Sequence, residues 1–277
     1  MCTRAGVAPD FSEPLETIIA KSLIKFASID SRHWIEFLLL TLPNLNTIDI
    51  ESLSDYNKRM LQMFYVTVWN KPANDWKDSE VVINLQTLAN CPVMLEELQE
   101  LLKYRYEQID FIDEPVNLGF DCPLELHCSY SRDQILVALD YMNLGAMRQG
   151  VKWLPDKKID LFFVTLNKSD KEYSPTTMYN DYSINDELFH WQSQSTTADT
   201  SATGQRYIHH SSQGSKIILF VREYKKDNLT GGAANYTFLG LAQYVSHEGS
   251  RPMNITWHLE KQIPAKFLKK TNKLVVA

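Results

Sequence analysis

The stretch KIDLFFVTLN, from Lys158 to Asn167, marks the point at which the chain changes its pattern. It is rich in aromatic and β-branched residues, which is typical of a β-strand. Four later stretches have the same character: QRYIHH, SKIILFVREYK, YTFLGLAQYVSHEG and MNITWHLEKQI. The turn-like segments LTGGAAN and EGSRP separate some of them, and NDYSINDELFH has room for one short helix. Residues 151–277 are therefore predicted to form a small, mostly antiparallel β-barrel or sandwich.

The first 150 residues carry a different pattern. Apolar residues recur at helical spacing in four stretches: PLETIIAKSLIKFAS, SDYNKRMLQMFYVTVW, PVMLEELQELLKYRYEQI and SRDQILVALDYM. In the last of them Ser131 and Gln134 have the spacing of a capping box. Such apolar stripes are typical of the core faces of a helical bundle. The sequence thus predicts an α+β chain, with a helical domain at 1–150 and a β-rich domain at 151–277.

The composition is that of a soluble globular chain with no membrane association. With 44% hydrophobic and 22% charged residues, a chain of 277 residues can bury a substantial core. Its longest apolar run, FLLLTL, is too short to cross a bilayer. The N-terminus has no signal-peptide pattern, and the four cysteines are scattered. We therefore expect a cytoplasmic protein without a disulfide framework.

Charge divides the chain unevenly. The net charge of −6 is the sum of −10 in the first 150 residues and +4 in the remainder. Only the C-terminal part has the sign expected of a surface that contacts phosphate, and its excess is small. An acidic helical part could instead dock on a basic protein partner.

A second stretch, ELFHWQSQSTT from Glu187 to Thr197, places a tryptophan among short hydrogen-bonding side chains. Trp191 offers a ring for base stacking, while Gln192 and Gln194 carry the amide groups that read adenine edges. If this stretch is a strand, His190, Gln192 and Gln194 share one face and Trp191 lies on the other. The alternative is that Trp191 is a core residue and that the glutamines only stabilise a loop.

Further candidates for DNA contacts lie around this motif. Arginine side chains can pair with phosphate or guanine, and polar or basic loop residues can contact the sugar–phosphate backbone. These candidates are Lys168, Ser174, Thr176, Arg206 and Arg251. The segment VSHEGSRPMNITW could place its loop beside the ELFHWQSQSTT motif and form a cleft with it. The simpler alternative is a hairpin tip with an internal ion pair.

Several ordered motifs in this part of the chain resemble one bacterial module. They are FFVTLNKSDKEYSPTTMYNDYSINDELFHWQSQSTT, TGQRYI, ILFVREYKK, YTFLG, YVSHEGSRPMNITW and IPAKFL, and they cover nearly all of Lys152–Ala277. The module is the uncharacterised C-terminal end of superfamily-two DEAD/DEAH-type helicases. Many of these helicases carry a phospholipase-D-like nuclease domain and are associated with restriction or phage defence. The resemblance implies work on DNA and a helicase or nuclease partner.

The resemblance does not extend to the helicase motor. No GxxxxGK[ST] phosphate loop occurs, and the pair Gly231–Gly232 is better interpreted as a hairpin turn. The residues before 151 resemble more loosely the helical region that precedes the module. The opening CTRAGV resembles an internal segment of the larger proteins, so we expect a stand-alone remnant or a fragment.

Motifs for catalysis are missing from the sequence. CPLELHC, from Cys122 to Cys128, lacks a second Cys/His pair, and His209 and His210 would point to opposite faces of a strand. A restriction-type nuclease core needs an acidic residue followed by a short acidic-x-Lys element. Asp160 and Lys168 match the first acid and the lysine, but Leu166 stands where the second acid should be and cannot bind magnesium. We therefore expect no metal, no cofactor and no catalytic residue.

The sequence predicts a non-catalytic DNA-recognition module of a defence system. The alternatives are a protein-interaction scaffold and a cryptic metal-dependent nuclease that uses Asp160, Glu172 or Asp181 with His190.

Overall fold

We describe the protein from a computed structural model, which covers residues 14–147, 150–167, 181–227 and 231–271. These residues divide into two compact units. The helical unit comprises the residues up to Ile112 together with Asp121–Pro123 and Asp133–Leu144. The β-rich unit comprises Asp113–Phe120, Leu124–Arg132 and the residues from Gly145 onward. Two short segments that precede residue 150 thus belong to the β-rich unit, which the predicted domain boundary does not anticipate.

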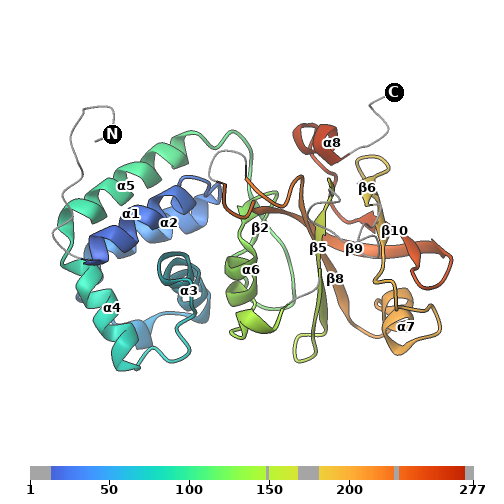
Figure 1. Ribbon diagram of the computed structural model, residues 1–277, viewed down its shortest axis with the longest axis horizontal. Coiled ribbons are helices and arrows are strands. Elements are labelled where there is room, and N and C mark those ends of the chain that lie inside the picture. Colours follow the sequence, from blue (N-terminus) through green and yellow to red (C-terminus); the bar gives the residue numbers. More distant parts are fainter. Residues whose placement is uncertain (1–13, 148–149, 168–180, 228–230, 272–277) are drawn as a thin grey trace. The chain divides into compact units, whose positions relative to one another are not determined.

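The helical unit is built from helices that pack into a bundle (Figure 1). Their bounds are α1 (Pro14–Phe26), α2 (Arg32–Thr41), α3 (Asp55–Trp69), α4 (Ser79–Ala89), α5 (Pro92–Glu107) and α6 (Arg132–Ala138). All four stretches with helical periodicity form helices, and α2 and α4 are additional. No helix among the described residues is long and apolar enough to cross a membrane.

Side-chain caps and one apolar core explain the bounds of these helices. Ser54 accepts a hydrogen bond from the backbone N–H of Asn57 at the start of α3, and Asn70 ends the helix in the left-handed conformation, with φ 56°. Trp34 is fully buried and donates its Nε1–H to the carbonyl of Met60 at 3.1 Å. Tertiary packing of the apolar faces therefore adds to the local helix signals.

The β-rich unit is organised around one mixed sheet. Along it the strands follow the order β4, β5, β8, β9, β10, β7, β6, and β3 pairs with β9 beside this path. Only the β5–β8 pair is parallel among the described pairs. The bounds are β3 (Ser129–Tyr130), β4 (Val151–Leu154), β5 (Ile159–Thr165), β6 (Tyr182–Ser183), β7 (Leu188–Gln192), β8 (Lys216–Arg222), β9 (Tyr236–Glu248) and β10 (Asn254–Leu259). A separate pair, β1 (Glu114–Pro115) and β2 (Glu125–Leu126), and two helices, α7 (Ala202–His209) and α8 (Ala265–Thr271), complete the unit.

The sheet is strongly curled. Strands β8, β9 and β10 lie between β5 and β7, which would separate β5 from β7 by about 19 Å in a flat sheet. Yet the rings of Phe162 on β5 and Trp191 on β7 stack with their centroids 4.0 Å apart. Tyr207 of α7 meets both rings edge-on, at 5.3 and 5.6 Å. The concave face of the sheet is therefore filled by aromatic side chains and covered by α7, which lies on one side of the strands (Figure 1).

Two bulges on β9 account for much of this curvature. The pairing register shifts between Leu219 and Phe220 on β8, and again between Thr256 and Trp257 on β10. In both places β9 contributes one extra residue, Leu239 or Val245, to the ladder. Such bulges bend a strand and increase its twist.

The structure corrects three sequence-based expectations. The sheet is mixed and does not close, so the barrel or sandwich prediction is wrong while the α+β class is confirmed. QRYIHH lies mostly in α7, because Ser201 caps a helix there by accepting the N–H of Gly204. NDYSINDELFH contains β6, a turn and the start of β7 instead of a helix.

The close approach of α7 to the backbone of Ala198 can be tested by a substitution at Gly204. A Cβ atom at this position would lie 2.1 Å from the carbonyl oxygen of Ala198. Alanine usually stabilises a helix relative to glycine, but here we expect Gly204→Ala to lower the free energy of unfolding by about 1–3 kcal/mol. Urea unfolding followed by circular dichroism measures the change. Gly145→Ala, where an added Cβ meets nothing within 4 Å, is the matched control. Equal stability of the two variants would contradict the prediction.

Candidate nucleic-acid interface

On β7 and β10, the convex side of the sheet carries polar side chains that alternate with buried ones. On β5 and β8, the residues of both faces are buried. On β7, Phe189 and Trp191 belong to the buried cluster, so His190 and Gln192 point to the opposite face. On β10 the same alternation separates Asn254 and Thr256 from Ile255 and Trp257. The register places His190 between Tyr182 and Thr256, and Thr256 opposite Ser246. We call this surface the polar face; its members are Tyr182, His190, Gln192, Ser246, Asn254 and Thr256.

Contacts between neighbouring strands order the polar face. The rings of Tyr182 and His190 stack with centroids 4.7 Å apart and an interplanar angle of 13°. The side-chain Nε2 of Gln192 donates to Asn254 Oδ1 at 3.0 Å, and its backbone N–H donates to Asp181 Oδ1 at 2.9 Å. A stacked ring pair thus lies beside a cross-strand pair of amides. These are the two group types that recognise bases, through ring faces and through hydrogen-bonding edges.

Trp191 does not provide the stacking surface that the sequence suggested. Its side chain is only 5% exposed, and one ring face is occupied by Phe162. Because Tyr207 also contacts the ring, a base could stack on Trp191 only after the core had opened. The prediction of base stacking by Trp191 is therefore wrong, and its alternative as a core residue agrees with the structure.

Arg206 is also occupied within the β-rich unit. Its guanidinium makes a bidentate ion pair with Asp160, at 2.7 and 2.9 Å, and lies over the ring of Trp153. Asp160 is fully buried, and burial raises the pKa of its carboxyl while the bond from Arg206 opposes that rise. Removing Arg206 would leave a buried acid without this partner, so the pair is structural. A phosphate-binding role for Arg206 does not fit this geometry.

The loop between β9 and β10 contacts the turn that follows β7. Arg251, in the left-handed conformation with φ 63°, donates its backbone N–H to Thr197 at 3.2 Å. Ser250 Oγ donates to Asp199 Oδ1 at 2.9 Å. The two motifs are thus brought together, as one of the two alternatives for this loop requires, and the Arg251 side chain is exposed at this tip. Gln194 lies beyond the end of β7, where its Oε1 accepts bonds from Thr197 and Tyr207, so it is not part of the polar face.

Three predicted contact residues, Lys168, Ser174 and Thr176, lie outside the described residues, as does Glu172. The remaining acids do not assemble the proposed nuclease site. Asp160 points to the concave face, towards α7, whereas His190 points to the convex face. Asp181 is buried and accepts the backbone N–H of Gln192.

One mixed cluster in the β-rich unit has atoms of the kind that bind metals. One ligand atom each from Asp113, Glu125 and Cys128 lies within 4.8 Å of the others. All three residues make further contacts with other groups of the protein. The cluster shows which residues have metal-binding chemistry and does not by itself define a metal centre.

His210 connects α7 to the second bulge of β9. Its Nδ1 lies 3.3 Å from the Ser215 carbonyl, and its Nε2 accepts the backbone N–H of Tyr244 at 3.1 Å. These partners require a neutral ring with the proton on Nδ1. Burial lowers the pKa of His210, and the Ser215 carbonyl and Glu260 act to raise it.

Comparison with known protein families identifies the β-rich region. A family described as a domain of unknown function, DUF3427, matches residues 124–270, which is more than half of the chain. The chain belongs to this family. No curated protein matches the sequence. The DUF3427 match begins at Leu124, whereas the sequence motifs that resemble the helicase-associated module cover nearly all of Lys152–Ala277. The match includes β2 and all strands of the mixed sheet.

Trp191 and Gln192 give a paired test of the two faces of the DUF3427 sheet. Trp191→Ala removes a buried ring, so we expect the free energy of unfolding to fall by about 3–5 kcal/mol. Gln192→Ala affects the polar face, so we expect a change within about 1 kcal/mol. Urea unfolding by circular dichroism compares the two variants. A small effect of Trp191→Ala would show that the ring is not part of the core.

The neutral state of His210 predicts a pH dependence of stability. Because its folded pKa lies below the unfolded value of about 6.5, its contribution is complete above that pH and is lost as the pH falls below it. His210→Gln keeps an acceptor for Tyr244 but cannot take up a proton. We expect this variant to be less stable by about 1–2 kcal/mol near pH 7.5, and to lose less stability between about pH 7.5 and 5.5.

Urea titrations of both proteins at the two pH values measure this difference. His127, whose pKa burial also lowers, contributes equally to both proteins and sets the common background. Equal losses on acidification would show that the pKa of His210 is the same in the folded and the unfolded chain.

Proposed function

We propose that the DUF3427 domain is a non-catalytic DNA-recognition module that contacts bases through its polar face. The supporting observation is the stacked Tyr182–His190 pair beside the Gln192–Asn254 amide pair on one side of the sheet. Sheets that bind nucleic acid use aromatic faces to stack bases and polar side chains to read their edges. Unlike the Trp191 ring, these groups are partly exposed.

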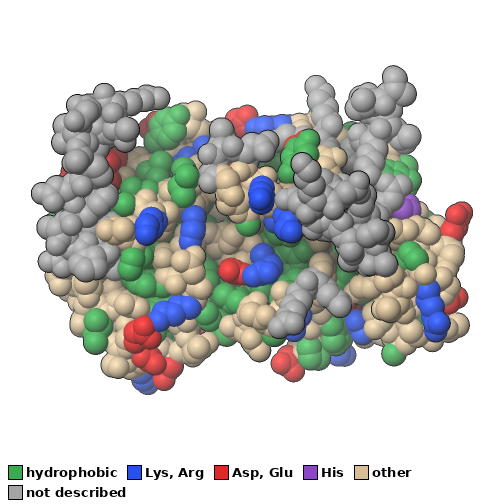
Figure 2. Space-filling view, in the orientation of Figure 1, with side chains coloured by type: hydrophobic (Ala, Val, Ile, Leu, Met, Phe, Trp, Pro, Cys, Tyr) green, Lys and Arg blue, Asp and Glu red, His purple; other side chains and the backbone are tan. Residues whose placement is uncertain are grey.

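The charges near the polar face favour base contacts over phosphate contacts. None of its six members is a lysine or arginine, and Glu248, next to Ser246 along the same face of β9, is acidic. On the side of the molecule drawn in Figure 2, Lys and Arg side chains are scattered among neutral and hydrophobic ones. Arg251, which is exposed at the loop tip, is a candidate for a phosphate contact. Binding of this kind depends little on salt.

The wider setting of the proposal rests on the resemblance to helicase-associated modules. A helicase or nuclease partner would deliver single-stranded DNA, whose bases are available to a sheet face. The domain would then act in the cytoplasm within a restriction or phage-defence system. Its ligand would be a particular sequence or a modified base.

A second candidate function is a protein-interaction scaffold. Two observations on the helical part favour it: the net charge of −10 in the first 150 residues, and the exposure of large apolar side chains. Leu40 on α2 is 74% exposed, and Val93 on α5 is 65% exposed. These two side chains are available to a partner protein.

DNA binding by the full chain tests the first proposal. Fluorescence anisotropy with single-stranded and duplex oligonucleotides, plain and base-modified, would be measured over a salt series. We expect tighter binding to single strands, with a shallow slope that corresponds to about two or three phosphate contacts. Tyr182→Ala should weaken binding about tenfold or more, because a stacking contact contributes about 1–3 kcal/mol.

Two glutamine substitutions provide the control. Gln192→Ala removes an amide of the polar face, whereas Gln213→Ala changes an exposed residue after α7. Only the first should weaken binding, and both variants should keep the melting temperature of the parent. No DNA affinity at low salt, together with co-purification of a helicase subunit, would favour the scaffold instead.

A further inference from the structure

The helical unit contains a cavity with a volume of about 300 Å³. One wall is a polar stripe on α3, formed by Asp55, Lys58, Arg59 and Gln62. Their spacing places them on one side of the helix, away from the apolar stripe that includes Met60 and Met63. The cavity is open to solvent on one side, so a ligand can reach this polar stripe.

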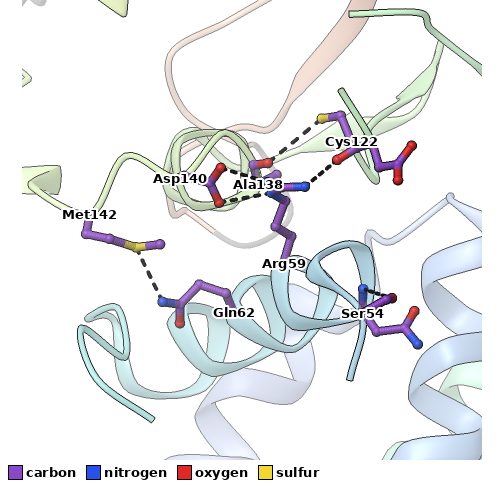
Figure 3. A network of polar contacts seen from close by, with 9 residues as sticks. Ser54, Arg59, Gln62, Cys122, Ala138, Asp140 and Met142 are labelled. Atoms are coloured by element: carbon purple, nitrogen blue, oxygen red, sulfur yellow. Dashed lines mark hydrogen bonds and ion pairs between the residues drawn. The ribbon is translucent and has the colours of Figure 1, made fainter. Parts of the chain in front are cut away.

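Hydrogen bonds hold two members of this stripe in place (Figure 3). The Arg59 guanidinium makes a bidentate ion pair with Asp140, with both distances 2.9 Å, and also donates to the carbonyl of Asp121. The side chain of Gln62 donates to the carbonyl of Ala73 and accepts its N–H, at 2.6 and 2.9 Å. Asp140 has the left-handed backbone conformation, with φ 59°, and the two hydrogen bonds from Arg59 help to stabilise it. The wall is therefore preformed.

The remaining walls are apolar. Val137 is buried, Met142 places its Sδ atom 3.3 Å from Gln62 Nε2, and Trp76 borders the same space. The Trp76 ring lies edge-on to Tyr65 with centroids 6.1 Å apart. An aromatic ring, a thioether and an aliphatic side chain form a surface suited to one flat apolar group.

Volume and charge narrow the class of ligand. A cavity of about 300 Å³ lies at the small end of ligand sites, which suits a molecule of amino-acid size. Two acids, Asp55 and Asp140, balance two bases, Lys58 and Arg59, so the lining does not favour a phosphate. Arg59 and Asp140 are paired with each other, and Lys58 Nζ donates to the carbonyl of Glu51 at 3.3 Å. The ammonium of Lys58 has two further N–H groups, so it and the carboxylate of Asp55 offer one charge of each sign to a ligand.

We propose that this cavity binds a free aromatic amino acid as its zwitterion. The α-ammonium group of the ligand faces Asp55, its carboxylate faces Lys58, and its ring packs against Trp76 and Met142. The site lies in the helical unit and is independent of DNA recognition by the polar face. It would make the chain responsive to a small metabolite of this class.

Fluorine NMR of the full chain labelled with 5-fluorotryptophan tests the proposal. The chain has six tryptophans, and the resonance lost in Trp76→Phe identifies Trp76. L-Phenylalanine should shift this resonance saturably with a Kd of about a millimolar, the affinity expected of so small a ligand. The other five resonances should stay in place. N-acetyl-L-phenylalanine amide, which lacks both charges, should bind about tenfold more weakly.

Two variants separate the charged contacts from folding. Asp55→Asn and Lys58→Gln change side chains outside the core, so they should keep the parent melting temperature while each weakens L-phenylalanine binding several-fold. Adenosine monophosphate is the phosphate-bearing comparison and should not bind at this site. The proposal fails if no probe shifts Trp76 up to about 10 mM, or if the blocked or phosphorylated probe binds as well as L-phenylalanine.

Discussion

The stack of Phe162 on Trp191 is the contact on which the architecture of the DUF3427 domain depends. It joins β5 to β7 across three intervening strands, which is possible only because the sheet curls. The curl creates a concave face that one short helix, α7, can cover. On β7 and β10 the convex side keeps polar residues, because a strand that buries one residue presents the next one to the other face, whereas β5 and β8 are buried on both faces. The curvature therefore places the aromatic core on the concave side of the sheet, and the polar face lies on the convex side of β7 and β10.

The buried ion pair of Asp160 and Arg206 extends the same arrangement. It fixes α7 to β5 beside the aromatic cluster, and it uses the charge of an arginine that the sequence alone offers as a DNA ligand. A buried acid needs such a partner, so the arginine is committed to the fold. The proposed recognition of DNA therefore uses side chains of the opposite face, where rings and amides lie on neighbouring strands.

Local patterns in the sequence predict much of the secondary structure and less of the tertiary structure. Alternation in LFHWQ correctly separates Trp191 from His190 and Gln192, because a strand has a period of two. It does not show that Asn254 lies next to Gln192, since a pairing across 62 residues depends on the whole sheet. The two bulges of β9 interrupt the period, and the parallel β5–β8 pair has no local signal. The sequence predicts a strand where α7 forms. The helix depends on the cap by Ser201 and on the close approach of Gly204 to Ala198, and neither contact has a periodic signal in the sequence.

The order of the strands also affects how the chain is made. Both β6 and β7 belong to the connection between β5 and β8, and β7 pairs with β10, which ends at Leu259. On the ribosome, the edge of β7 that pairs with β10 therefore stays unpaired until almost the whole domain has been synthesised. During that interval an aromatic strand edge is open to other chains. A chaperone, or a preceding domain of a longer polypeptide, would be most useful during this step of biogenesis.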